Sequence, residues 1–160
     1  MADLFQLDVV TPVRQVLSRK VEEVIAPGTV GEFGVLPGHT TFLTTLKPGK
    51  LTVMDPETTV YMAISGGFAE VTGSRVIILA EAAEMADEID LVETRKDLEI
   101  AQEKLKTLNR EDPEFSKWEK RASMAEVKIK VARRQAWITV VGTPCDFQGG
   151  YSPLFLCDIP

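Results

Sequence analysis

Glycine and proline are so unevenly distributed along this 160-residue chain that they divide it before any motif is considered. Residues 1–80 contain eight of the eleven glycines and five of the nine prolines, whereas residues 81–135 contain no glycine and a single proline, Pro113. Residues 136–160 hold the remainder. Both residue types mark turns between strands and are rare inside helices. The first segment is therefore predicted to be β structure and the second to be helical.

The overall composition excludes several classes of protein. Hydrophobic residues make up 44% and charged residues 26%, close to an average folded domain, which excludes general disorder. A formal charge of −6 without a basic run makes nucleic acid and anionic lipid poor partners. No apolar stretch approaches the ~20 residues that span a bilayer, and the first residues lack the pattern of a secretory signal. One histidine and two cysteines are too few for a disulfide framework or a four-ligand zinc site, so no metal is expected.

Short runs of β-branched and aromatic residues in the first segment are separated by turn signals about every ten residues. Pro27-Gly28, Pro37-Gly38 and Pro48-Gly49 are three of these signals. Each pair is predicted to form a type II turn, because proline fixes one φ and glycine supplies the positive φ that follows. The spacing predicts an antiparallel sandwich or barrel of about eight to ten strands.

The second segment has helical periodicity. Apolar residues recur at spacings of three, four or seven over residues 91–108 and at three or four over residues 115–132. Asp87 is predicted to cap the first helix, and Asp112 followed by Pro113 to begin the second. Two helices joined by a short loop are expected to form an antiparallel hairpin. Because several seam residues are alanines, which bury little area, the hairpin is expected to be modestly stable and able to open.

The predicted fold class is α+β, an N-terminal antiparallel β-sandwich followed by a C-terminal antiparallel two-helix hairpin. The sandwich domain is assigned to residues 1–86, the hairpin to 87–135 and an atypical tail to 136–160. Within the tail, residues 137–141 look strand-like. The tail is expected to be flexible; the alternative is that its aromatic residues dock on the sandwich or a partner and restrict opening of the hairpin.

Five blocks of sequence resemble, in order and spacing, the epsilon subunit of bacterial F-type ATP synthases. They are LDVVTP, VIAPGTVGEFGVLPGH, LKPG, SGGFAEV and LAEAAE, which begin at Leu7, Val24, Leu46, Ser65 and Leu79. The resemblance covers residues 4 to about 135, and the family fold is a ten-strand sandwich followed by two helices. It implies a non-catalytic rotor component of the central stalk, which couples proton flow to ATP synthesis at the cytoplasmic face of the cell membrane. The implied partners are the gamma subunit, the ring of c subunits and the alpha and beta subunits.

The resemblance also points to residues that contact the c ring. Glu32 and His39 match family positions that face the polar loops of the c subunits. A carboxylate there would meet arginine and amide partners. The alternative for His39 is that its ring satisfies a local backbone group.

In the family, the second helix can extend along gamma and block ATP hydrolysis. Its basic side chains would then meet an acidic surface on the catalytic beta subunits. The alternative is a solvated face. The basic residues concerned are Lys117, Lys120, Arg121, Lys128, Lys130, Arg133 and Arg134.

Some family members bind ATP on the hairpin through an Ile/Leu-Asp-x-x-Arg-Ala motif and two arginines four residues apart. Here Asp90 matches the aspartate, but Glu93 stands at the motif arginine, and Met124 and Lys128 stand at the other two. A carboxylate repels phosphate, and lysine lacks the bidentate fork of arginine. Asp90 and Lys128 are therefore a weak candidate nucleotide site, and no cofactor is expected.

Two other classes of function stay open beside the rotor subunit. A free-standing enzyme would need converging titratable groups, which a lone His39 and two late cysteines do not supply. An ATP-sensing regulatory binding protein would need the nucleotide site on the hairpin. Neither nucleic acid nor direct insertion into a membrane is expected.

Overall fold

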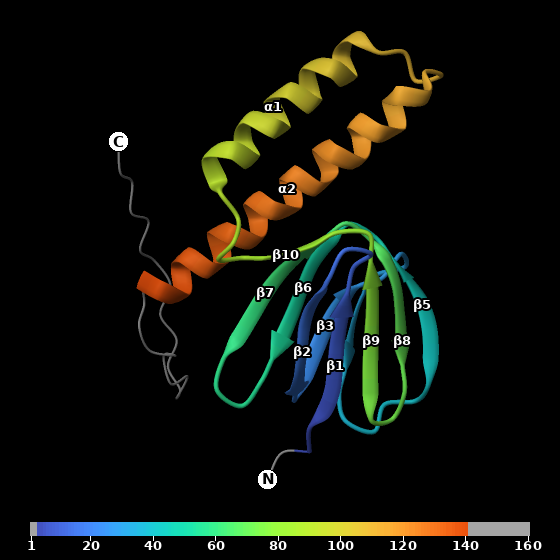
Figure 1. Cartoon of the computed structure of the whole chain (residues 1–160), viewed down its shortest axis with the longest axis vertical. Coiled ribbons are helices and arrows are strands. Elements are labelled where there is room, and N and C mark those ends of the chain that lie inside the picture. Colours follow the sequence, from blue (N-terminus) through green and yellow to red (C-terminus); the bar gives the residue numbers. More distant parts are fainter. Residues whose placement is uncertain (1–2, 141–160) are drawn as a thin grey trace, which may run out of the picture.

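The protein is described by a computed structural model over residues 3–140, with side chains up to Arg133. Within that range ten strands are followed by two helices, which confirms the predicted α+β class (Figure 1). The helices are α1 (Leu91–Thr107) and α2 (Pro113–Val140). The strands are β1 (Phe5–Val10), β2 (Gln15–Val21), β3 (Glu23–Pro27), β4 (Glu32–Val35), β5 (Phe42–Leu46), β6 (Gly49–Met54), β7 (Thr59–Ile64), β8 (Gly67–Val71), β9 (Arg75–Ala80) and β10 (Ala83–Met85).

The strands form two five-stranded sheets that pack face to face. Sheet A has the order β2-β1-β9-β8-β5, and sheet B has the order β10-β7-β6-β3-β4. Neighbours pair antiparallel except β1 and β9, which are parallel. Alternate residues point inward, so that Leu7 and Val9 of sheet A and Leu51 and Val53 of sheet B have no exposed surface. This alternation builds the core of the sandwich.

Only one of the three Pro-Gly pairs has the backbone expected of a type II turn. Gly38 has a φ of +77°, whereas Gly28 and Gly49 do not have positive φ. Gly49 begins β6, and a Cβ there would lie 2.6 Å from the Cβ of Pro27 at the end of β3. The type II prediction is wrong for Gly28 and Gly49, because at Gly49 the need for glycine comes from a close approach of two strands.

The hairpin begins later than predicted. Asp90, not Asp87, caps α1, and its side chain accepts two backbone N–H bonds at 2.7 and 3.1 Å. Residues 86–88 form a turn, and Ile89 is buried in a cluster beneath α2, so the helix starts only after it. Asp112 precedes α2 as predicted, and its carboxylate accepts from the backbone N–H of Glu114 at 3.0 Å.

The second helix continues to Val140. The strand predicted over residues 137–141 is therefore wrong for residues 137–140, and Val141 lies outside the described residues. A short apolar run does not distinguish a strand from the continuation of a helix. Extending an existing helix needs no new nucleation, so the helical alternative prevails. The other predictions for the tail concern residues beyond those that the structure describes.

The hairpin packs on sheet B, where α2 contacts β7 and β6 (Figure 1). The buried residues of this contact are mostly small and form a cluster separate from the sandwich core. They are Ala63, Ala86, Ile89, Val131 and Ala132. Three of the five are alanines, and the larger side chains that pack against them are only partly buried, so the contact that docks the hairpin is small. These larger residues are Tyr61, Leu91, Met124 and Val127.

Candidate functional site

The two residues predicted to contact the c ring lie at opposite ends of the sandwich. Glu32 begins β4 and shares a cavity with Lys47, which follows β5. His39 precedes β5, and the neighbouring Gly38 donates a backbone hydrogen bond to Gly73 in the β8–β9 turn. The two ends are separated by about the length of the five-residue β5, roughly 16 Å. Glu32 and His39 therefore do not touch each other, but Phe42 lies between them: its ring packs on His39, and it lines a pocket together with Glu32.

Each of the two residues has a different environment. The side chain of Glu32 is exposed beside Val30, which is fully exposed at the β3–β4 turn. The ring of His39 is partly buried; its Nδ1 lies 2.9 Å from the carbonyl oxygen of Thr40, and the ring packs on Phe42 at 5.2 Å between centroids. His39 thus makes a local backbone contact of the kind considered as the alternative.

The outer face of sheet A carries an apolar patch, here called the apolar face, formed by Val10, Leu43, Phe68 and Leu79. Leu43, Phe68 and Leu79 are 71%, 52% and 52% exposed. Phe68 of β8 pairs directly with Leu79 of β9, and Val10 of β1 pairs with Leu79 from the other side. A shallow, mainly apolar cavity of about 360 Å³ lies between Val10, Phe68 and Leu79.

None of the described elements covers this face, because the helices pack on sheet B (Figure 1). Large apolar side chains gathered on one exposed face typically mark a contact with another protein. Sequence reasoning missed this patch. The signal was available in β9, RVIILA, where Ile77 and Leu79 are apolar on the face opposite the buried Val76 and Ile78.

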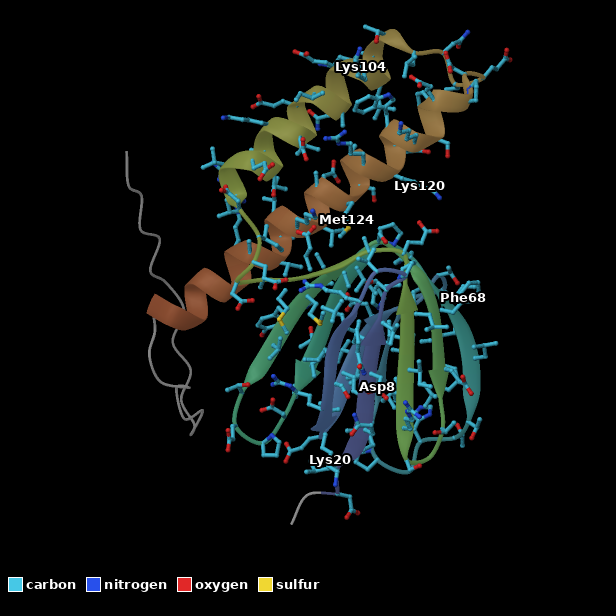
Figure 2. All side chains as sticks on the ribbon, viewed as in Figure 1. Asp8, Lys20, Phe68, Lys104, Lys120 and Met124 are labelled. Atoms are coloured by element: carbon cyan, nitrogen blue, oxygen red, sulfur yellow. The ribbon has the colours of Figure 1, made fainter. Side chains whose placement is uncertain are left out.

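A buried carboxylate lies on the same outer face, in β1 (Figure 2). Asp8 is 4% exposed and accepts hydrogen bonds from Ser18 at 2.7 Å, from Gln6 and Gln15 at 3.2 Å each, and from Arg75 at 2.9 Å. The hydrogen bond from Ser18, together with those from Arg75 and Gln6, outweighs burial and holds the pKa of Asp8 below its ordinary value. The carboxylate cross-links β1, β2 and β9 and has no free position for acid–base chemistry.

Ion pairs attach the hairpin to the sandwich and its helices to each other. Lys128 of α2 pairs with Glu84 of β10 at 2.5 Å, and Arg14 pairs with Glu88 before α1 at 3.1 Å. Arg121 of α2 pairs with Asp97 of α1 at 2.8 Å, which holds the helices together. In the docked hairpin these cations are therefore already engaged.

The basic residues predicted to meet the beta subunits do not form one free face. Arg121 and Lys128 are in the ion pairs just described, whereas Lys117 and Lys120 are exposed. Lys130 and Arg133 face a cavity between α2 and the sandwich. The side chain of Arg134 lies outside the described part of the chain.

The candidate nucleotide residues both have structural partners. Asp90 caps α1, and Lys128 is paired with Glu84. The pocket between the helices beside Lys128 has a volume of about 230 Å³. Small-molecule sites usually measure about 300–1,000 Å³, so this pocket is small for a nucleotide.

Within residues 3–140, no three histidine, cysteine, aspartate or glutamate side chains are grouped so that they could hold a metal ion. No helix in the described range is long and apolar enough to cross a membrane.

Comparison with known proteins adds the family context. The family described as "ATP synthase, Delta/Epsilon chain, beta-sandwich domain" matches residues 4–86, which contain all ten strands described above. An ATP synthase epsilon chain of Geotalea uraniireducens is 43% identical over 136 residues, covering 85% of this chain and 99% of that protein.

Solved structures of similar chains agree with this match. A chain in the cryo-EM structure of the Euglena gracilis mitochondrial ATP synthase, OSCP/F1/c-ring in rotational state 1, aligns with a TM-score of 0.60 and 25% identity. The alignment covers 85% of this chain and 81% of that one. A chain in the Tetrahymena thermophila ATP synthase central stalk/c-ring structure aligns with a TM-score of 0.51 and 14% identity, over 80% and 96% of the two chains, and shows the fold alone.

Proposed function

The chain belongs to the ATP synthase delta/epsilon family, and from this membership we propose that it serves as the non-catalytic epsilon subunit of an F-type ATP synthase. It takes no chemical step itself and couples proton flow to ATP synthesis as part of the rotor. The observation that carries the proposal is the division of the structure into a sandwich whose sheet A has an exposed apolar face and a hairpin docked on sheet B through a small apolar cluster. The alternative of an ATP-sensing binding protein is not favoured.

The apolar face is the surface proposed to bind the gamma subunit. Its exposed side chains would lose contact with water on assembly, at roughly 25 cal/mol per Å² buried. The sandwich would then turn with gamma and the c ring as one stiff body, peripheral to the cytoplasmic face of the cell membrane. The alpha and beta subunits would be reached only by the hairpin.

Association with gamma tests the proposal through one residue of that face. Phe68→Asp places a charge at the centre of the apolar face and is expected to weaken binding of the full chain to gamma by a hundredfold or more. Ile100→Asp is the control, because Ile100 is 46% exposed on α1, away from sheet A. Equal binding by Phe68→Asp and the wild type would exclude this face as the gamma contact.

Contact with the c ring is proposed for Glu32 and is tested separately from His39. Glu32→Gln keeps the shape of the side chain but removes the charge that would attract arginine and amide partners. It is expected to weaken rotor assembly or proton pumping, measured in membranes that contain the complex. His39→Ala, at the other end of the sandwich, shows whether that end contributes at all. Normal pumping and assembly by Glu32→Gln would contradict the proposed contact.

Inhibition of ATP hydrolysis is proposed for the undocked hairpin. Opening would release Lys128 from Glu84 and Arg121 from Asp97, and the basic side chains of α2 could then meet acidic surface on the beta subunits. Removal of residues 87–160 is expected to raise the ATPase rate of the complex. An unchanged rate would count against this role.

Nucleotide binding at Asp90 and Lys128 is not expected, since the helix cap and the ion pair occupy both residues. Titration of the full chain with magnesium-free ATP, compared between wild type and Lys128→Gln, tests this expectation. A micromolar affinity that is lost in Lys128→Gln would contradict it.

A further inference from the structure

A basic cleft lies between the sandwich and α2 in the docked hairpin. Its volume is about 550 Å³, within the range of small-molecule sites. One wall comes from the sandwich and carries Lys47 and Lys50; the other comes from α2 and carries Lys130 and Arg133. The cleft is thus formed only when the hairpin is docked.

The charges in this cleft are unbalanced. Four cationic side chains line it together with a single carboxylate, Glu32. None of the four cations belongs to the ion pairs found among the described residues, although Lys128 and Arg121 of the same helix are both paired. Docking therefore brings four cations from two elements into one cleft with a single carboxylate as counter-charge, and three of them, Lys47, Lys130 and Arg133, are exposed to solvent.

The sandwich side of the cleft has a rigid shape. Pro27 is buried at the end of β3 and packs so closely on Gly49 that a Cβ on Gly49 would approach the proline ring within 2.6–2.8 Å. Lys50 is held with its ammonium group 5.8 Å from the centre of the Tyr61 ring. One wall of the site is therefore preformed before any ligand arrives.

We propose that this cleft binds a polyphosphate anion, which bridges Lys47 and Lys50 of the sandwich to Lys130 and Arg133 of α2. An ion with one charged group would satisfy one wall only, whereas linked phosphate groups present negative oxygens to both. The anion would relieve the repulsion between the walls and hold the hairpin in its docked position. The site is distinct from the Asp90–Lys128 position and does not depend on assembly with other subunits.

Titration calorimetry on the full chain at low salt tests this proposal, with inorganic tripolyphosphate as the probe. Lys47→Gln combined with Lys130→Gln is expected to weaken binding roughly tenfold or more. The control combines Lys20→Gln with Lys104→Gln, which also removes one charge from the sandwich and one from the hairpin, but far from the cleft (Figure 2). Glu32→Gln removes the opposing carboxylate and is expected to tighten binding a few-fold.

Hydrogen exchange of α2 is measured in the same variants. Tripolyphosphate is expected to slow this exchange in the wild type but not in the Lys47→Gln, Lys130→Gln double variant. A parallel titration with ATP shows whether the phosphate chain is recognised alone or as part of a nucleotide. Absence of saturable tripolyphosphate binding would overturn the proposal. So would equal weakening by the cleft and control pairs, or loss of binding in Lys128→Gln alone.

Discussion

Replacing Val131 with aspartate should undock the hairpin without unfolding the sandwich. Val131 has no exposed surface and lies in the small cluster that joins α2 to β7. The change removes about 1.5–3 kcal/mol of valine burial. It also places a carboxylate in a cluster of apolar side chains, at a cost of several kcal/mol. A total of about 4 kcal/mol would raise the undocked fraction roughly a thousandfold.

Hydrogen exchange with peptide-level resolution is the appropriate measurement. Exchange in α2 over residues 113–133 should accelerate, because isolated helices are marginal in water. The strands of sheet A should keep their protection, since the sandwich core contains no residue of either helix. Val92→Asp is the matched control: Val92 is 65% exposed on α1, and surface substitutions usually change stability by less than about 0.5 kcal/mol.

Two outcomes would refute this reasoning. If sheet A lost protection together with α2, the hairpin would be part of the same cooperative unit as the sandwich. If α2 kept its protection in Val131→Asp, the ion pairs of Lys128 and Arg14 would hold the hairpin without the apolar cluster. Either result would remove the basis for a hairpin that opens by itself.

Three further predictions concern the sandwich. Asp8→Asn should lower the free energy of unfolding by about 2–3 kcal/mol in urea titrations, because the amide cannot accept all the hydrogen bonds that are donated to the carboxylate. Glu70→Gln is the control, since Glu70 is exposed. The folded state lowers the pKa of Asp8, so its carboxylate stabilises the fold above the unfolded pKa of about 3.9, and this stabilisation is lost as pH falls through the folded pKa. The free energy of unfolding of Asp8→Asn should therefore depend less on pH in acid than that of the wild type. Gly67→Ala should destabilise the folded protein by roughly 3 kcal/mol or more in thermal unfolding, since φ is +138° and a Cβ would lie 1.9 Å from the Leu79 carbonyl oxygen. Gly73→Ala is the control: a Cβ at Gly73 would meet open space, so this change should cost less than about 1 kcal/mol in the same assay.

The order of the elements was accessible from the sequence, because the signals that set it are local. Proline and glycine separate the strands, and the change to helical periodicity places the hairpin after residue 86. The choice between Asp87 and Asp90 as helix cap was not accessible. Both residues suit the position, and only the burial of Ile89 beneath α2 decides between them. The same limit applies to Gly49, whose role comes from its approach to Pro27 in another strand.

The functional surfaces likewise depend on contacts that only the tertiary structure decides. Glu32 and His39 are seven residues apart in the family motif, yet β4 and the turn after it carry them to opposite ends of the sandwich. The apolar face joins residues of β1, β5, β8 and β9. The basic cleft joins the β5–β6 connection and the start of β6 to a helix some 80 residues later in the chain. Neighbouring residues along the chain therefore specify turns, strands and helices through backbone preferences that act over a few positions. Which side chains meet depends on how the sheets pair and where the hairpin docks, because burial and electrostatic interaction depend on distance in space.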